Sequence, residues 1–188
     1  MISISIDAST TMIGYSIWDE DKLIKYGKLA PTIKDLEWRE RVKDFIPQLQ
    51  TIINEYKPKK MYAEDVPLFE KGQGAKGKKT LVQLGATQGS IIGLCGANNI
   101  EIEFIPVSTW RSNIGLYNGT EEGKERDNLK IASIIKANEL FGINLKCLYT
   151  RNGTYKSKGS DDDIADSILV YASTRDKYKI KSKSFGRK

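Results

Sequence analysis

The chain has 188 residues, of which 39% are apolar, with 30 Lys or Arg against 24 Asp or Glu, two Cys and no His. The absence of His excludes Ser-His-Asp and Cys-His catalysis and every His-ligated metal site, which leaves Asp, Glu and Lys as the candidate chemical groups. A chain of this length buries roughly 70% of its surface as one domain, so it needs neither a disulfide nor a structural metal. We expect a cytoplasmic protein, because the cysteines are few and no apolar run is long enough for a signal peptide or a membrane span.

Alternation of apolar and polar residues predicts five strands, and apolar residues at three- and four-residue spacing predict four helices. Isoleucines alternate with polar residues along the first strand, which ends at Asp7. Pro47 marks a kink in the first helix, and Pro58 follows its end. The expected strands are residues 2–7, 14–18, 22–29, 60–66 and 101–106, and the expected helices are residues 36–56, 80–97, 124–141 and 163–171. This order indicates an α/β fold with a mixed sheet and no internal repeat.

The helix expected over residues 80–97 carries Gly85, Gly89 and Gly93 on one stripe. Each interior glycine weakens a helix by about 1 kcal/mol relative to Ala. Close packing of another backbone would compensate, so we expect the stripe to lie against the sheet or against a partner subunit.

Basic residues gather in two segments. Residues 175–188 hold seven basic residues and one acid, so the preceding 174 residues are formally neutral. We expect a folded domain over residues 1–175 and a basic tail over residues 176–188 that stays flexible until it meets a polyanion, with a solvated solubility tail as the alternative. The second segment combines glycines with lysines and lacks periodicity, which suits a phosphate backbone but also an ordinary surface loop. Its lysines are Lys71, Lys76, Lys78 and Lys79.

Four carboxylates are the candidates for chemistry. Asp7 ends an apolar strand and Glu64 lies within a strand, although a turn residue and a salt bridge are the ordinary explanations for these two positions. Asp163 and Asp166 share one face of the last helix; helix capping accounts for the acids of the first turn but less well for Asp166, one turn deeper. A set of oxygen donors without His or Cys favours Mg²⁺ or Mn²⁺ over zinc, so we expect a metal site.

Short motifs along residues 1–174 resemble those of the RuvC family of Holliday junction resolvases, and the short body with a separate basic tail looks like phage-encoded members. The motifs are Ile6-Asp7-Ala-Ser-Thr-Thr-Met-Ile-Gly14-Tyr15, Ala63-Glu64, Gln83-Leu-Gly85-Ala-Thr-Gln-Gly89, Lys124 at a helix start, and Asp163-Ile-Ala-Asp166. The resemblance implies a ribonuclease H-like fold, in which a mixed five-stranded sheet is flanked by helices, and a homodimer.

The same resemblance implies an endonuclease that resolves four-way junctions, and other branched DNA such as forks, by paired nicks that leave 5′-phosphates. It implies two Mg²⁺ ions per active site, replaceable by Mn²⁺, and leaves open which of Asp161, Asp162 and Asp163 ligates most directly. The basic residue near the scissile phosphate corresponds to Lys124, with Lys130 as the alternative. Phe69 is the nearest match to the aromatic that wedges into the junction. The implied metal ligands are Asp7, Glu64, Asp163 and Asp166, and the DNA contacts are Phe69, the lysines of the second basic segment, and Lys130.

Two other functions fit parts of the sequence. The pattern Asp7-x-Ser9-x-Thr11-x-x-Gly14 also resembles the phosphate loop of actin-like and sugar-kinase ATPases, but those proteins duplicate the domain and 188 residues leave no room for a second copy. A non-catalytic architectural protein could bind junctions through the basic segments. Four acids around a DNA site argue against it, because without metals they would repel the phosphates.

Overall fold

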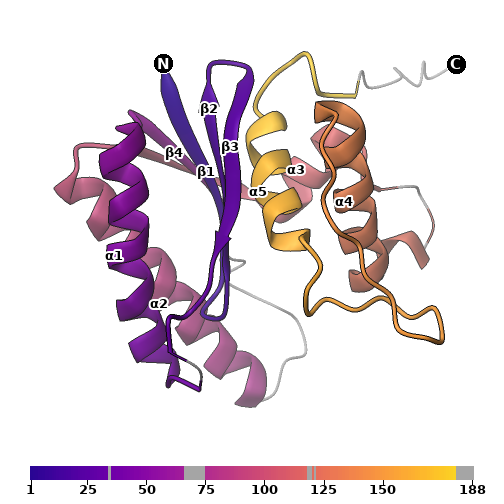
Figure 1. Ribbon diagram of the computed structural model, residues 1–188, viewed down its shortest axis with the longest axis horizontal. Coiled ribbons are helices and arrows are strands. Elements are labelled where there is room, and N and C mark those ends of the chain that lie inside the picture. Colours follow the sequence, from indigo (N-terminus) through magenta and orange to yellow (C-terminus); the bar gives the residue numbers. More distant parts are fainter. Residues whose placement is uncertain (34, 66–74, 118–119, 121, 181–188) are drawn as a thin grey trace, which may run out of the picture.

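A mixed five-stranded sheet with the order β3-β2-β1-β4-β5 lies between two layers of helices (Figure 1). The structure is a computed structural model that describes residues 1–33, 35–65, 75–117, 120 and 122–180. β1 pairs antiparallel with β2 and parallel with β4, so the first three strands form a meander and the last two extend the sheet in parallel. The strands are β1 (Ile2–Ala8), β2 (Ile13–Asp19), β3 (Lys22–Leu29), β4 (Lys60–Asp65) and β5 (Glu101–Pro106). The expected mixed sheet is confirmed.

Among the described residues, two α-helices cover one face of the sheet and three α-helices lie on the other (Figure 1). α1 (Trp38–Tyr56) and α2 (Ala75–Ala97) form the first layer, and Pro47 lies inside α1. The second layer consists of α3 (Val107–Ile114), α4 (Arg126–Phe141), α5 (Asp162–Ala172) and the short 3₁₀ helix η1 (Glu122–Lys124). In the described part of the chain, no helix is both long and apolar enough to cross a bilayer.

Three of these elements differ from the sequence expectation. α2 begins at Ala75 and not at residue 80, so Lys76, Lys78 and Lys79 lie in this helix, and the expectation of a loop at these three residues is wrong. α3 was not expected, because an eight-residue helix with only two buried side chains, Trp110 and Ile114, is too short to show a helical period. α4 begins at Arg126, since Lys124 belongs to the 3₁₀ turn before it.

α5 is the most buried helix because small polar residues let it approach the sheet. Ile4 and Ile6 of β1 face the layer of α1 and α2, whereas Ser3 and Ser5 alternate onto the opposite face and are fully buried there. The Ser16 hydroxyl of the neighbouring strand donates to the backbone oxygen of Ser167 in α5, at 3.1 Å. α5 is therefore fixed between the sheet and α4, and its first turn has a defined position over β1 and β2.

The glycine stripe of α2 does not pack against the sheet, so the first of its two expected partners is excluded. A side chain built at Gly85, Gly89 or Gly93 would meet nothing within 4 Å. Val82 and Ile92 on the same helix are 62% and 49% exposed. The stripe is an open surface in the single chain, and packing against a partner subunit stays a prediction.

The first residues of the expected flexible tail lie against the body. Tyr178 packs edge to face on Phe141, with 5.1 Å between the ring centres. The Ile180 amide donates to the backbone oxygen of Asn113 at 2.8 Å, and Lys177 pairs with Asp21. A ring contact, a backbone hydrogen bond and an ion pair thus hold residues 177–180 against the body, which the charge count did not reveal. Residues 181–188 fall outside the described part, and the division into domain and tail stays a prediction.

Candidate active site

Three elements bring the four expected carboxylates to one end of the sheet. Asp7 and Glu64 follow Ile6 and Ala63, which face each other across the parallel pair of β1 and β4. Parallel strands end at the same edge, so the two acids emerge side by side. The start of α5, with Asp163 in its first turn and Asp166 in the next, lies over the adjoining strand β2. The negative charge of Glu64, Asp166 and Asp163 acts on Asp7, which shows that the four acids form one electrostatic cluster.

Gly14 allows the first turn of α5 to lie directly on β2. It is the register partner of Asp7, and a side-chain carbon added to it would fall 1.9 Å from the backbone oxygen of Asp163. A contact this short with backbone cannot be relieved by a rotamer change. Gly14 therefore sets the distance between the strand and helix that carry Asp7 and Asp163.

Replacing Gly14 by Ala is expected to lower the free energy of unfolding by about 3 kcal/mol, because the helix must move away from the sheet. Glu139→Ala is the control, since Glu139 is exposed on α4, and it should change the free energy of unfolding by less than about 0.5 kcal/mol. Urea unfolding of both variants measures the difference. Equal stability of Gly14→Ala and the parent chain would contradict the close approach.

Burial raises the pKa of every acid in the cluster, and the negative charge of neighbouring acids adds to the effect at Asp7, Asp163 and Asp166. Burial contributes most to the raised pKa of Asp7, which lies well above its usual value, and Glu64 is the next cause. Burial also raises the pKa of Glu64 and of Asp163, and it raises the pKa of Asp166 to about 7, with the charge of Glu64 adding to the effect. When ionised, the four acids together form a buried concentration of negative charge. This charge favours the binding of a cation or of protons at the cluster.

Two residues of α3 hold the inner carboxylates. The Trp110 indole donates to Glu64 Oε2 at 2.9 Å, and the Arg111 guanidinium lies 3.8 Å from Asp166 Oδ2. Arg111 also lowers the pKa of both acids against the effect of burial. Sequence reasoning missed this pair because it missed α3. Pro106 at the end of β5 could have indicated the position of this pair. The residues that follow Pro106 lie beside the end of β4, where Glu64 lies.

The three consecutive acids at the start of α5 have different surroundings. Asp161 pairs with Lys28 at 2.9 Å and caps the Lys146 amide. Asp162 is only 2% exposed and forms an ion pair with Lys130. Asp163 acts on Asp7, which supports Asp163 as the member of the three that belongs to the cluster.

The expected basic and DNA-contacting residues are only partly covered by the structure. Lys130 lies beside the cluster, where its charge lowers the pKa of Asp7, and its ammonium also donates to Ser157. Lys79 is exposed on α2. Phe69 and Lys71, together with the side chains of Lys76, Lys78 and Lys124, lie outside the described part.

The donor set fits a hard divalent cation. All four groups are carboxylates, and Asp166 Oδ1 is buried without a hydrogen-bond partner among the described residues. A bound cation would lower the repulsion that raises their pKa values. As the side chains of the described part stand, however, no three His, Cys, Asp or Glu residues are grouped closely enough to hold a metal ion. The four carboxylates are suitable ligands for a divalent cation. Their positions in the structure do not define a coordination geometry, however.

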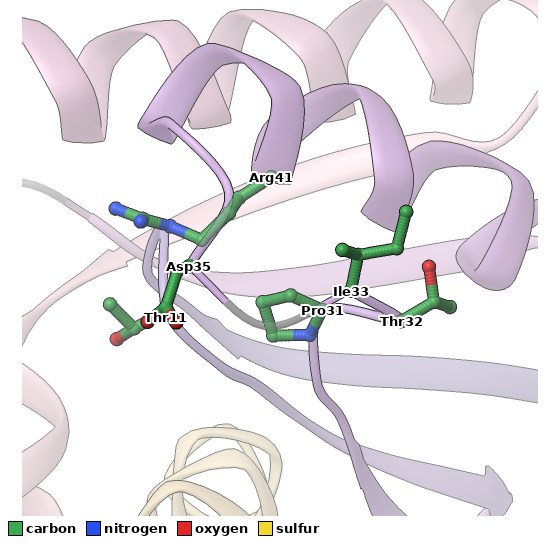
Figure 2. Close-up of a pocket in the computed structure, with 6 residues that line it drawn as sticks. All are labelled: Thr11, Pro31, Thr32, Ile33, Asp35 and Arg41. Carbon is green, nitrogen blue, oxygen red and sulfur yellow. The ribbon is translucent and has the colours of Figure 1, made fainter.

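A pocket is lined by the β1–β2 loop, by the segment before α1 and by Arg41 of α1 (Figure 2). Its lining residues are Thr11, Pro31, Thr32, Ile33, Asp35 and Arg41. The Arg41 side chain donates to the backbone oxygens of Thr10 and Leu36, at 2.5 and 2.6 Å. Arg41 thus ties the loop that follows β1 to the start of α1, and none of the four carboxylates lines the pocket.

Sequence comparison finds two bacterial relatives, although no protein-family model matches the chain. The crossover junction endodeoxyribonuclease RuvC of Fusobacterium nucleatum is 34% identical over 101 residues, which are 52% of this chain and 50% of that protein. The protein of the same name from Petrotoga mobilis is 29% identical over 136 residues, 70% of this chain and 78% of that protein. The match thus spans about half the length of the first relative.

Comparison with solved structures also finds similarity to RuvC. Thermus thermophilus RuvC in complex with a Holliday junction substrate has a TM-score of 0.61 and 10% identity, over 94% of this chain and 98% of that chain. This likeness establishes the expected ribonuclease H-like fold. The chain is therefore similar to RuvC proteins in sequence over part of its length, and it shares their fold over nearly all of it.

Proposed function

We propose that the protein is a metal-dependent endonuclease that resolves DNA four-way junctions, and other branched DNA such as forks. The observation that carries the proposal is the convergence of Asp7, Glu64, Asp163 and Asp166 at one end of a RuvC-like sheet. The relatives named as crossover junction endodeoxyribonucleases, and the structural neighbour bound to a Holliday junction, support this choice of substrate.

The four carboxylates are the proposed ligands of two Mg²⁺ ions, for which Mn²⁺ would substitute. Such ions, when bound, supply an activated water and stabilise the leaving 3′-oxygen of the phosphodiester, so that the product carries a 5′-phosphate. Trp110 orients Glu64 through its indole N–H, and Arg111 offsets part of the buried charge of Asp166. Lys124 is the proposed basic residue near the scissile phosphate, with Lys130 as the alternative.

The remaining contacts to DNA are proposed from the sequence. Phe69 and the lysines of residues 71–79 would meet the junction next to the carboxylates, and residues 181–188 would add salt-sensitive attraction to phosphates in general. None of these residues provides a metal ligand, so their loss should weaken binding more than it slows cleavage.

Incubation with a synthetic four-way junction, with and without Mg²⁺, tests the function. We expect paired nicks with 5′-phosphates only when the metal is present. Tight binding without cutting in Mg²⁺ or Mn²⁺ would favour the architectural alternative, and ATP turnover by the chain would favour the ATPase alternative.

The open stripe of α2 is the proposed interface of a homodimer, since paired nicks on a two-fold junction need two active sites. Ile92→Glu places a charge on this stripe and is expected to yield a monomer at micromolar concentration that makes single, unpaired nicks. Ile135→Glu on α4 is the control, because Ile135 is also 49% exposed in the single chain. Sedimentation and nicking of a supercoiled junction plasmid provide the measurements. A dimer that survives Ile92→Glu would contradict the interface.

A further inference from the structure

The segment between α4 and α5 forms a hairpin, residues 146–158, that the sequence did not predict. Tyr149 and Tyr155 pair as an antiparallel bridge, and the Lys156 amide donates to the Leu148 oxygen at 2.8 Å. The Thr150 amide closes the turn by donating to the Thr154 oxygen, also at 2.8 Å. Gly153 supplies the positive φ of 77° that this turn requires. The hairpin is therefore an ordered projection.

The 146–158 hairpin is joined rigidly to the candidate active site. The buried Ser160 hydroxyl accepts from the Leu148 amide and donates to the Lys156 oxygen, at 2.9 and 2.8 Å. Ser157 accepts from Lys130, which also pairs with Asp162 at the start of α5. Figure 1 shows the hairpin in orange, projecting from the end of α5 at which that helix begins. Its tip is thus fixed relative to the four carboxylates.

The charge of this hairpin is entirely positive. Residues 143–160 contain no acid, and all four of their basic residues are exposed. Within the described part of the chain, no ion pair engages Arg151, Lys156 or Lys158, whereas Lys43 and Lys60 elsewhere on the surface pair with glutamates. The charge of Lys146 acts on Asp161. The four basic residues are Lys146, Arg151, Lys156 and Lys158. On a body that is formally neutral over residues 1–174, the hairpin is a local positive projection.

We propose that the 146–158 hairpin binds the sugar–phosphate backbone of the DNA arm that lies beside the cut strand. The choice of DNA as the polyanion rests on the proposed function of the site. Exposed cations without acid partners release counterions when they neutralise phosphates, and cations on a preformed hairpin lose less entropy on binding than those on a loose tail. The hairpin also offsets the repulsion between the phosphates and the neighbouring carboxylates.

Arg151→Gln/Lys156→Gln/Lys158→Gln tests this proposal without touching the cluster or its ion pairs. Binding of a labelled four-way junction to the full chain is measured by fluorescence anisotropy in EDTA at several salt concentrations. We expect affinity at 0.15 M salt to fall by about tenfold or more, and the slope of log affinity against log salt to lessen by about 2 to 3, near one unit per lost phosphate contact.

A matched control removes the same charge at the opposite end of the sheet, where β1 begins: Lys22→Gln/Lys57→Gln/Lys59→Gln. The control should bind within about twofold of the parent chain, and the charge-retaining variant Arg151→Lys/Lys156→Arg/Lys158→Arg should keep its affinity and salt slope. Equal losses in the hairpin variant and the control, or no loss in either, would overturn the proposal.

Cleavage separates this proposal from the proposed function. At saturating protein, low salt and Mg²⁺, the hairpin variant should cut the junction at the rate of the parent chain. A parent chain that binds but never cuts would refute the nuclease, while the anisotropy measurements would still decide whether the hairpin binds DNA.

Discussion

Replacing Glu64 by Gln is expected to slow junction cleavage by at least about a thousandfold, which corresponds to roughly 4 kcal/mol of lost transition-state stabilisation. The amide keeps the shape of the side chain, and its carbonyl oxygen can still accept the hydrogen bond from Trp110. It cannot carry the negative charge that holds a cation. Junction affinity should stay within about twofold, because most binding energy comes from phosphate contacts elsewhere.

Single-turnover cleavage at saturating protein measures this effect apart from binding. Glu103→Gln is the matched control: Glu103 is an exposed residue of the neighbouring strand β5 whose partner is Lys60. It should cut at the rate of the parent chain. Cleavage by Glu64→Gln at that same rate would remove Glu64 from the proposed ligand set.

Strands were easier to predict than short or non-periodic elements. Alternation along β1 works as a signal because its isoleucines face one layer of helices and its serines face α5, so both faces are defined by packing. α3 and the 146–158 hairpin carry no such period, since each buries few side chains. The surroundings of the α2 glycines could be determined only from the structure, because a glycine in a helix is compatible both with a close backbone contact and with an open surface.

The four candidate carboxylates could be selected from the sequence because their spacing relative to strand ends and helix turns is local information, and their role as metal ligands stays a prediction. The residues that contact these carboxylates could not be predicted in this way. Trp110 and Arg111 reach Glu64 and Asp166 only because β5 lies next to β4, which is a fact of topology. The preference for Asp163 over Asp161 and Asp162 likewise rests on Lys28 and Lys130, which pair with those two acids, and it stays a prediction.

The metal-free protein is expected to lose stability as the pH rises from 5 to 8. The pKa of Asp166 is about 7 in the folded protein and about 4 when the chain is unfolded, so between these values the folded state binds more protons than the unfolded state. The stabilisation by this proton is complete below pH 4 and is lost as the pH rises through 7, by up to about 4 kcal/mol. The raised pKa values of Asp7, Glu64 and Asp163 act in the same direction.

Asp166→Asn identifies the source of this effect, because an amide has nothing to titrate and keeps the shape of the acid. In EDTA the variant should match the parent chain near pH 5 and unfold several degrees higher at pH 8, since 1 kcal/mol shifts the midpoint by about 2 to 4 °C in a chain of this size. Millimolar Mg²⁺ should raise the midpoint of the parent chain at pH 8 and leave Asp166→Asn less affected, because a cation replaces the protons as the partner of the cluster. Thermal unfolding followed by circular dichroism at four pH values, with and without Mg²⁺, tests both expectations. Parallel pH profiles for the two proteins in EDTA would show that Asp166 does not hold the proton, and the charge of the cluster would then have to be balanced by Arg111 and Lys130 alone.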